Sequence, residues 1–369
     1  MTSVDALLDI PGRSASSSGA NIHKPETLTA VLPASPVQRR IGSIPLWFAT
    51  AISVSAVNLS RTVCAILAGT ALAMSFPRNG SAEIVYATSI NTDQIYTVDT
   101  TTHAVTPVFN ATVPLDSLLF DMSGRIVYTE LDNGQVNAFN PSTHSNVSLA
   151  TGLAQPIDLA LEPSLASVLV SDASSNTLSR VSLTGGVLGT IGVGGRPDGL
   201  IYDGIGRLFV NVSSGFQANN SQVEQIDPTT GAVLATTGNT GVFLDGLTFD
   251  PATGMLFASG YNNGRIVQIN PNTMAFTFLT PTGPSLSQPD GIVSGGSGDL
   301  FIASRANSTV MQYDIATDAD TAIATINGLD DLAPASGLGA PVPEPASLAI
   351  FGTALAGLGL IRRRRRRSV

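Results

Sequence analysis

The chain has almost no cysteine, and its central region has almost no positive charge. Its 369 residues include one cysteine, Cys64, which lies in an apolar stretch near the N-terminus. Residues 83–340 therefore contain no cysteine and must fold without disulfide bonds. They contain no lysine and six arginines, whereas 23 of the 27 Asp and Glu residues of the chain lie among them. This region therefore has a net charge of about −17, although the whole chain has −9.

These shortages exclude several classes of function for the central region. A strongly acidic surface repels nucleic acid and anionic membrane surfaces, while it attracts cations and cationic partners. The histidines are His23, near the N-terminus, and His103 and His144, which we expect in loops after third strands. No serine stands in a Gly-x-Ser-x-Gly motif, and no group of Cys and His could hold zinc. The sequence therefore favours a role without catalysis.

Three features follow one another at the C-terminus. Pro343-Glu344-Pro345 precedes an apolar stretch over residues 346–361, and six consecutive arginines come next. A helix over this stretch would rise about 24 Å, and arginines that reach back to the membrane surface would help it to span a hydrocarbon core of ~30 Å. We predict a linker over 336–345, a transmembrane helix over 346–361 and a cytoplasmic tail over 362–369. The arginines are Arg362, Arg363, Arg364, Arg365, Arg366 and Arg367.

This order of features resembles the PEP-CTERM sorting signal, a bacterial tail read by exosortases. The resemblance implies that the export machinery and an exosortase are partners of the chain. It also implies a location at the cell envelope, on the surface or outside the cell, with contact to the inner membrane through the helix before processing. A permanent anchor that is never cut is the first alternative. A basic patch for nucleic acid is the second, although such patches are rarely joined to an apolar helix.

Export requires a signal at the N-terminus as well. Residues 41–82 contain two apolar stretches with arginines ahead of them, and small residues at Gly80 and Ala82 suggest cleavage before Glu83. A transmembrane hairpin that stays in the membrane is the alternative for this segment. Residues 1–40 are rich in Ser, Ala, Thr and Pro without apolar periodicity, and we interpret them as a disordered leader or as a mis-assigned start.

The region between the two signals repeats one unit. Each copy opens on an aspartate followed within two residues by Leu, Ile or Ala, and the copies start 42, 40, 47, 45 and 40 residues apart. A turn and an apolar strand follow, as in Gly206-Arg207-Leu208-Phe209-Val210, and then an alternating strand that ends at Asn-Pro or Asp-Pro. The opening aspartates are Asp116, Asp158, Asp198, Asp245, Asp290 and Asp330.

Three or four short strands in 40 to 47 residues make one blade of a β-propeller. The region begins with later strands of a blade, without an opening aspartate, and ends with an opening strand at Asp330 and nothing after it. Joined, the two ends complete a blade and remove exposed sheet edges. We therefore predict an all-β, six-bladed β-propeller over residues 83–335, closed by strands from both termini. Seven blades with one degenerate copy is the alternative.

Pro197-Asp198-Gly199-Leu200, with similar phrases at Asp245 and Asp290, resembles NHL-repeat and gluconolactonase/regucalcin-like propellers. We expect the six aspartates to begin innermost strands and to form a ring near one mouth of the central channel. Close carboxylates raise one another's pKa, and Ca²⁺ would relieve their repulsion. The gluconolactonase-like resemblance implies that Asp198 helps to hold a central metal. The alternative is that these aspartates bond to nearby backbone N–H groups at the strand starts.

Two loops are candidates for ligand binding. The loop between the second and third strands is extended in the unit from Asp198, and we expect it on the same face as the aspartates. Ordinary turn chemistry is the alternative for its asparagines. The candidate residues of this loop and of the corresponding loop in the next unit are Phe216, Asn219, Asn220, Asn262 and Asn263.

Two functions remain in competition. The first is a surface or matrix protein without enzymatic activity, which binds or scaffolds an extracellular polysaccharide or another surface protein. The second is a Ca²⁺-dependent lactonase or esterase of the gluconolactonase-like type, in the periplasm or on the surface. The missing catalytic residues favour the first, and the aspartates favour the second.

Overall fold

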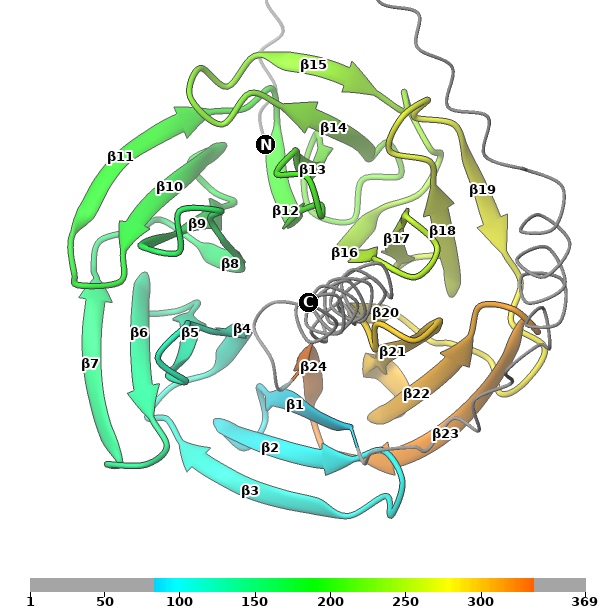
Figure 1. The fold of residues 1–369 in the computed structure, drawn as a ribbon, viewed down its shortest axis with the longest axis horizontal. Helices are drawn as coiled ribbons and strands as arrows, with labels where there is room; N and C mark the ends of the chain where they lie inside the picture. The colour runs from blue at the N-terminus through cyan, green and yellow to red at the C-terminus, as the bar shows by residue number, and fades with distance from the viewer. Residues whose placement is uncertain (1–82, 335–369) are drawn as a thin grey trace, which may run out of the picture. The chain divides into compact units, whose positions relative to one another are not determined.

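The computed structural model describes residues 83–334, and they form six four-stranded antiparallel sheets around a central axis (Figure 1). This is an all-β, six-bladed propeller, as predicted.

We number the blades by the order of their innermost strands. Blade 1 has β4 (Leu115–Phe120), β5 (Ile126–Glu130), β6 (Gln135–Asn140) and β7 (Ser145–Ala150); blade 2 has β8 (Pro156–Leu161), β9 (Ser167–Asp172), β10 (Thr177–Ser182) and β11 (Val187–Gly192). Blade 3 has β12 (Arg196–Tyr202), β13 (Leu208–Ser213), β14 (Gln222–Ile226) and β15 (Val233–Thr236); blade 4 has β16 (Leu244–Asp250), β17 (Met255–Gly260), β18 (Arg265–Ile269) and β19 (Phe276–Leu279). Blade 5 has β20 (Pro289–Ser294), β21 (Asp299–Ser304), β22 (Thr309–Asp314) and β23 (Ala319–Thr325), with the short 3₁₀ helix η1 (Arg305–Asn307) between β21 and β22.

Blade 6 joins the two ends of the described chain. Its strand order is β24-β1-β2-β3, with β24 (Leu329–Pro334) innermost, followed by β1 (Ile84–Ser89), β2 (Gln94–Asp99) and β3 (Val105–Asn110). Val85 pairs with Pro334, and Ser89 pairs with Leu329. The predicted closure by strands from both termini is thus confirmed, because the C-terminal strand β24 supplies the innermost strand of a blade whose other three strands come from the N-terminal end.

Burial falls from the axis to the rim of the propeller. Every residue of β5, β9 and β13, the second strands of blades 1 to 3, is buried because both faces of each strand pack against a neighbouring blade. The outermost strands β3 and β7 are largely exposed. Between blades 1 and 2, for example, Val127 and Val136 pack with Val168 and Val181 in one apolar cluster. Each such side chain contributes roughly 1.5–3 kcal/mol through burial.

The described part of the chain contains no helix that could cross a membrane. The predicted leader, the export segment with Gly80 and Ala82, and the linker, helix and arginine tail after residue 335 all lie outside the described residues. The export segment and the transmembrane helix therefore stay predictions.

Candidate functional site

The innermost strand of every blade carries a β-bulge at the same place. In blade 1, Leu115 pairs with Glu130 and Leu118 pairs with Tyr128, so that Asp116 and Ser117 together lie opposite Thr129. Equivalent shifts occur in the other five blades. The six bulges define two layers of residues around the channel. The mouth layer is Asp116, Ile157, Asp198, Asp245, Asp290 and Asp330, and the second layer is Ser117, Asp158, Gly199, Gly246, Gly291 and Asp331.

This register corrects one part of the predicted ring. Because Pro156 pairs with Asp172 and Leu159 with Val170, Asp158 lies in the second layer and Ile157 takes its place in the mouth layer. The mouth layer therefore has five aspartates rather than six. The repeat spacing alone could not reveal this, since a shift of one residue leaves the blade length almost unchanged.

The glycines of the second layer are required by the close approach of neighbouring innermost strands. A Cβ atom on Gly199 would lie 2.4 Å from the carbonyl oxygen of Asp245, and one on Gly246 would lie 2.7 Å from that of Asp290. Both obstacles are backbone atoms, which cannot rotate away. The Asp-Gly dipeptide thus recurs partly because only glycine fits against the backbone of the neighbouring innermost strand.

Polar side chains of the second strands tie four of the blades to the next blade. Thr88 Oγ1 donates a hydrogen bond of 2.7 Å to the carbonyl oxygen of Asp116, and Asn211 Nδ2 donates one of 2.7 Å to that of Asp245. The Oγ atoms of Ser171 and Ser259 bond to the carbonyl oxygens of Asp198 and Asp290 in the same way. The sequence carried a signal for these links, a recurring Ser, Thr or Asn inside an otherwise apolar strand.

The aspartate side chains have different partners. Asp158 accepts hydrogen bonds from Ser117 Oγ at 2.8 Å and from the backbone N–H groups of Leu159 and Leu200, which is the backbone bonding that the sequence left open as an alternative. Asp116 and Asp245 have no such side-chain bonds within residues 83–334. The structural explanation therefore fits Asp158 but leaves these two carboxylates of the mouth layer unexplained.

Two arginines enter the mouth layer, and sequence reasoning missed both. Arg196 forms an ion pair with Asp198, and its guanidinium carbon lies 5.2 Å from the centre of the Phe216 ring. Arg305, in η1, contacts Asp290 at 2.8 Å and Asp330 at 3.0 Å. Arg305 lies 15 residues after Asp290, in the loop that follows β21, so only the folded blade brings them together.

Burial raises the pKa values of these carboxyl groups. The pKa of Asp198 rises from 3.8 to about 8, because burial outweighs the opposing effect of Arg196. The pKa of Asp116 lies well above its usual range because of burial and, next, the nearby Asp290 and Asp245 carboxylates. Asp245 is shifted in the same direction, first by burial and then by Asp290 and Asp198.

A cavity of about 340 Å³, the mouth cavity, opens above the mouth layer. Asp116 and Asp330 line it together with Arg196, Arg305 and Phe216. The predicted loop candidates therefore divide into two groups. Phe216 lines the cavity, whereas Asn262 Nδ2 binds Gln217 O at 2.9 Å and Asn219 Oδ1 at 2.8 Å and so braces the loop. Within this loop Asn220 bonds to Ser214, and Asn263 Oδ1 accepts from the N–H of Arg265 in an ordinary turn.

Below the mouth the channel contains a small cavity of about 20 Å³, which lies between the aspartates and the glycines of the two layers. This is room for about one water molecule or a single small ion. Within residues 83–334, no three or more Asp, Glu, His or Cys side chains are grouped so that they could hold a metal ion. The Ca²⁺ ring over Asp116, Asp158, Asp198, Asp245, Asp290 and Asp330 stays a prediction.

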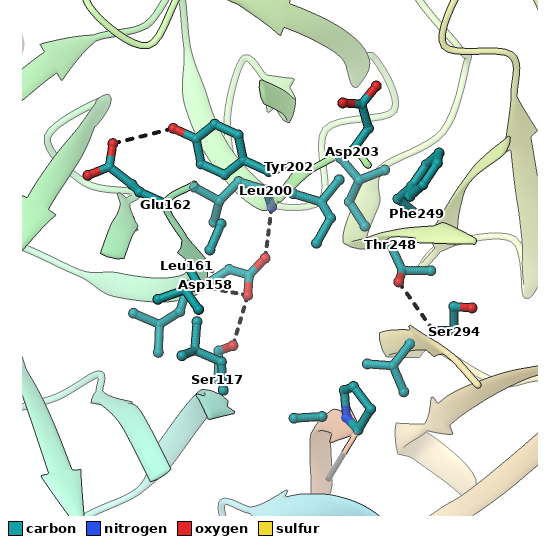
Figure 2. A pocket seen from close by; sticks show the side chains of 18 of the residues that line it. Ser117, Asp158, Leu161, Glu162, Leu200, Tyr202, Asp203, Thr248, Phe249 and Ser294 are labelled. Carbon is teal, nitrogen blue, oxygen red and sulfur yellow. Dashed lines mark hydrogen bonds between the residues drawn. The ribbon is translucent and has the colours of Figure 1, made fainter. Parts of the chain in front are cut away.

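A second cavity, the far cavity, occupies the opposite face, where the innermost strands end (Figure 2). Its volume is about 580 Å³, and apolar side chains such as Leu161 and Phe249 line much of it. Glu162 accepts a bond of 3.4 Å from the Tyr202 hydroxyl at its rim. Sequence reasoning missed this cavity, because it forms only where the ends of six separate strands converge.

The two histidines of residues 83–334, His103 and His144, lie in turns after third strands, as predicted. His103 is in the turn between β2 and β3, and His144 is in the turn between β6 and β7. Third strands run from the mouth to the far face, so both turns lie on the far face of the propeller.

Solved structures of low sequence identity share this fold. A chain of a nidogen/laminin complex matches with a TM-score of 0.60 and 15% identity, over 69% of this chain and 99% of that one. A protein of unknown function from Bacteroides caccae matches with a TM-score of 0.55 and 13% identity, over 69% and 99%. At such identities the likeness shows the propeller fold alone.

The C-terminal motif provides the more particular finding. Residues 341–366 match the family model of the PEP-CTERM protein-sorting motif, which confirms the resemblance seen at Pro343-Glu344-Pro345 and the six arginines. The motif implies an exported protein that an exosortase processes and that is sorted to the cell surface. No curated protein matches the chain.

Proposed function

We propose that this chain is an exosortase-sorted propeller that acts as a binding or scaffold module at the cell surface or in the extracellular matrix. The match of residues 341–366 to the PEP-CTERM motif carries the proposal, because that motif implies export and sorting. The fold supports a binding role, since loops of several blades meet around one mouth on a closed, rigid ring. An extracellular polysaccharide or another surface protein is the kind of partner that such a location offers.

The direction of the chain ends supports the mouth as the binding face. Val85 pairs with Pro334, so both ends of the described chain leave the propeller together, and Pro334 lines the far cavity. Eight residues separate Pro334 from Pro343, and they span at most about 30 Å. A tail held at the membrane would therefore keep the far face toward the membrane and turn the mouth away from it.

Processing of the tail tests the proposal. In a host with an exosortase we expect a shortened protein outside the cell membrane, and in the same host without exosortase we expect the full-length chain in the membrane fraction. Joint replacement of Pro343, Glu344 and Pro345 by alanine should reproduce the second result. Joint replacement of Ser336, Gly337 and Leu338, in the same linker, should not. Identical size and location of the protein in all four cases would overturn the proposal.

A Ca²⁺-dependent lactonase or esterase is the second candidate, and the five aspartates of the mouth layer favour it. Carboxylate oxygens are the ligands that Ca²⁺ prefers. A rise in melting temperature at millimolar Ca²⁺, together with turnover of a lactone panel, would support this candidate. A melting temperature that does not respond to Ca²⁺ would remove it.

A further inference from the structure

We propose that the mouth cavity binds a primary ammonium group carried on an apolar stem, as in an aliphatic amine or a lysine side chain of a partner protein. The inference rests on the proposed use of the mouth as the binding face and names the chemistry that this face recognises. Its main support is the juxtaposition of Asp116 and Ile157. These two residues occupy the mouth layer in neighbouring blades and both line the mouth cavity.

The arginines that reach the mouth layer are fewer than its aspartates. Arg196 pairs with Asp198, and Arg305 is shared between Asp290 and Asp330. Within residues 83–334 this leaves Asp116 and Asp245 without an ion-pair partner, and Asp116 is the one of these two that lines the mouth cavity. A cation that enters the cavity would therefore meet a carboxylate that no arginine holds.

A second observation points to a missing hydrogen-bond partner. The Oδ2 atom of Asp198 is buried without a hydrogen-bond partner, and the side chain, which lines the narrow part of the channel, is 2% exposed. Buried polar atoms almost always have a hydrogen-bond partner in the protein, in water or in a bound group. An ammonium group has three donors, so it can bond to one carboxylate and still serve other oxygens of the layer, directly or through water.

The walls of the cavity fit an apolar stem. Ile157 replaces the aspartate of the other five blades beside Asp116, and Ile90 and Leu131 line the same cavity. Phe216 lines it as well, and its ring is 59% exposed and packs edge-on against Phe243 with centroids 5.5 Å apart. An inorganic cation would gain nothing from these apolar groups, whereas the methylene groups of an amine would bury surface against them.

Burial also couples binding to protonation. The raised pKa of Asp116 means that a bound cation must draw its carboxyl group into the charged form, against burial, Asp290, Asp245 and Asp331 and with the help of Arg305. Amine affinity should therefore increase with pH up to the point at which Asp116 is ionised in the free protein.

The test is calorimetric titration of the full-length chain in detergent. The probes are n-butylamine as a free amine and an acetylated, amidated peptide with one central lysine, each compared with a counterpart in which the amine is acetylated. We expect one of the two probes or both to bind at one site per chain, while the acetylated counterparts do not bind. Binding of the peptide only identifies a partner protein as the source, and binding of the free amine identifies a small ligand; both results support the proposal.

Variants localise the site. Asp116→Asn should weaken binding at least about tenfold, as expected for loss of a charged hydrogen bond. Asp93→Asn removes the same charge from a mouth-side turn outside the cavity, and it should leave the affinity unchanged. Should Asp116→Asn fail to fold, Phe216→Ser in the exposed loop should weaken butylamine binding but not the binding of the ammonium ion.

Three results would overturn the proposal: no binding of either amine probe at millimolar concentration, equal losses in Asp116→Asn and Asp93→Asn, or Ca²⁺ bound at the mouth with no displacement by the amines. Each of these could occur while the tail is still processed by an exosortase. Failure of this inference is therefore distinguishable from failure of the proposed function.

Discussion

Asp198 shows, at the scale of one residue, that a buried carboxyl group at the mouth lowers the stability of the fold. Its side chain is almost fully buried, yet only one of its two carboxylate oxygens has a hydrogen-bond partner within the described residues. The pKa of about 8 means that the folded protein holds a proton on this group at pH values where the unfolded chain, with a pKa near 3.8, has already lost it. Such a group destabilises the fold as pH rises.

The stability of the protein should therefore fall between about pH 4 and pH 8. A raised acid pKa leaves the unfolded state with fewer bound protons, so the free energy of unfolding decreases with pH in this window and levels off above it. Asp116 and Asp245 are shifted in the same direction and add to the effect. We expect the melting temperature to drop by several degrees from pH 5 to pH 8, and the drop to be smaller in Asp198→Asn. A melting temperature that rises over this range would contradict the shift.

The innermost strand is the element in which sequence and structure differ most. The repeat predicted these strands, their number and their order around the axis, because spacing and alternation are local signals that survive in each blade. The register of the bulge was not evident from the repeat spacing, since it depends on which backbone groups pair across β8 and β9. This register makes Asp158 the second residue of its bulge and so places it in the second layer. The approach of Arg305 to Asp290 was also hidden, because it arises from a loop that folds back over the strand.

The glycines of the bulges should be sensitive to a single methyl group. In Gly246→Ala the new Cβ would lie 2.7 Å from the carbonyl oxygen of Asp290 and 3.0 Å from the N atom of Ile292. We expect the free energy of unfolding to fall by roughly 1–3 kcal/mol, as for other overpacked sites. Gly189→Ala, in the exposed outer strand β11, meets no atom within 4 Å and should change stability by less than about 0.5 kcal/mol. Urea titration of both variants compares them, and equal effects would contradict the close approach.

Closure of the ring concerns the whole molecule, because β24 is the one strand that joins the C-terminal part of the propeller to its N-terminal part. Leu332 of β24 is buried in a cluster with Val85 and Ala87 of β1. We expect Leu332→Ala to lower the free energy of unfolding by roughly 2–5 kcal/mol. Leu188→Ala, at a position in β11 that is 62% exposed, should cost little. If Leu332→Ala unfolds in urea at the same midpoint as Leu188→Ala, the closing strand adds no stability.

The orientation of the whole propeller follows from its two ends, and single cysteines can measure it on cells. Phe216, on the mouth side, and Ile205, in the turn between β12 and β13 on the far face, are 59% and 80% exposed. Residues 83–334 contain no native cysteine, so each variant has a single cysteine in the propeller. In cells without exosortase the tail should hold the far face near the membrane. We therefore expect a bulky, membrane-impermeant maleimide to label Phe216→Cys faster than Ile205→Cys, although Ile205 is the more exposed of the two in the isolated domain. After extraction in detergent the order should reverse, because only the intrinsic exposure then matters. Equal labelling on cells, or a reversed order there, would show that the mouth does not face away from the membrane.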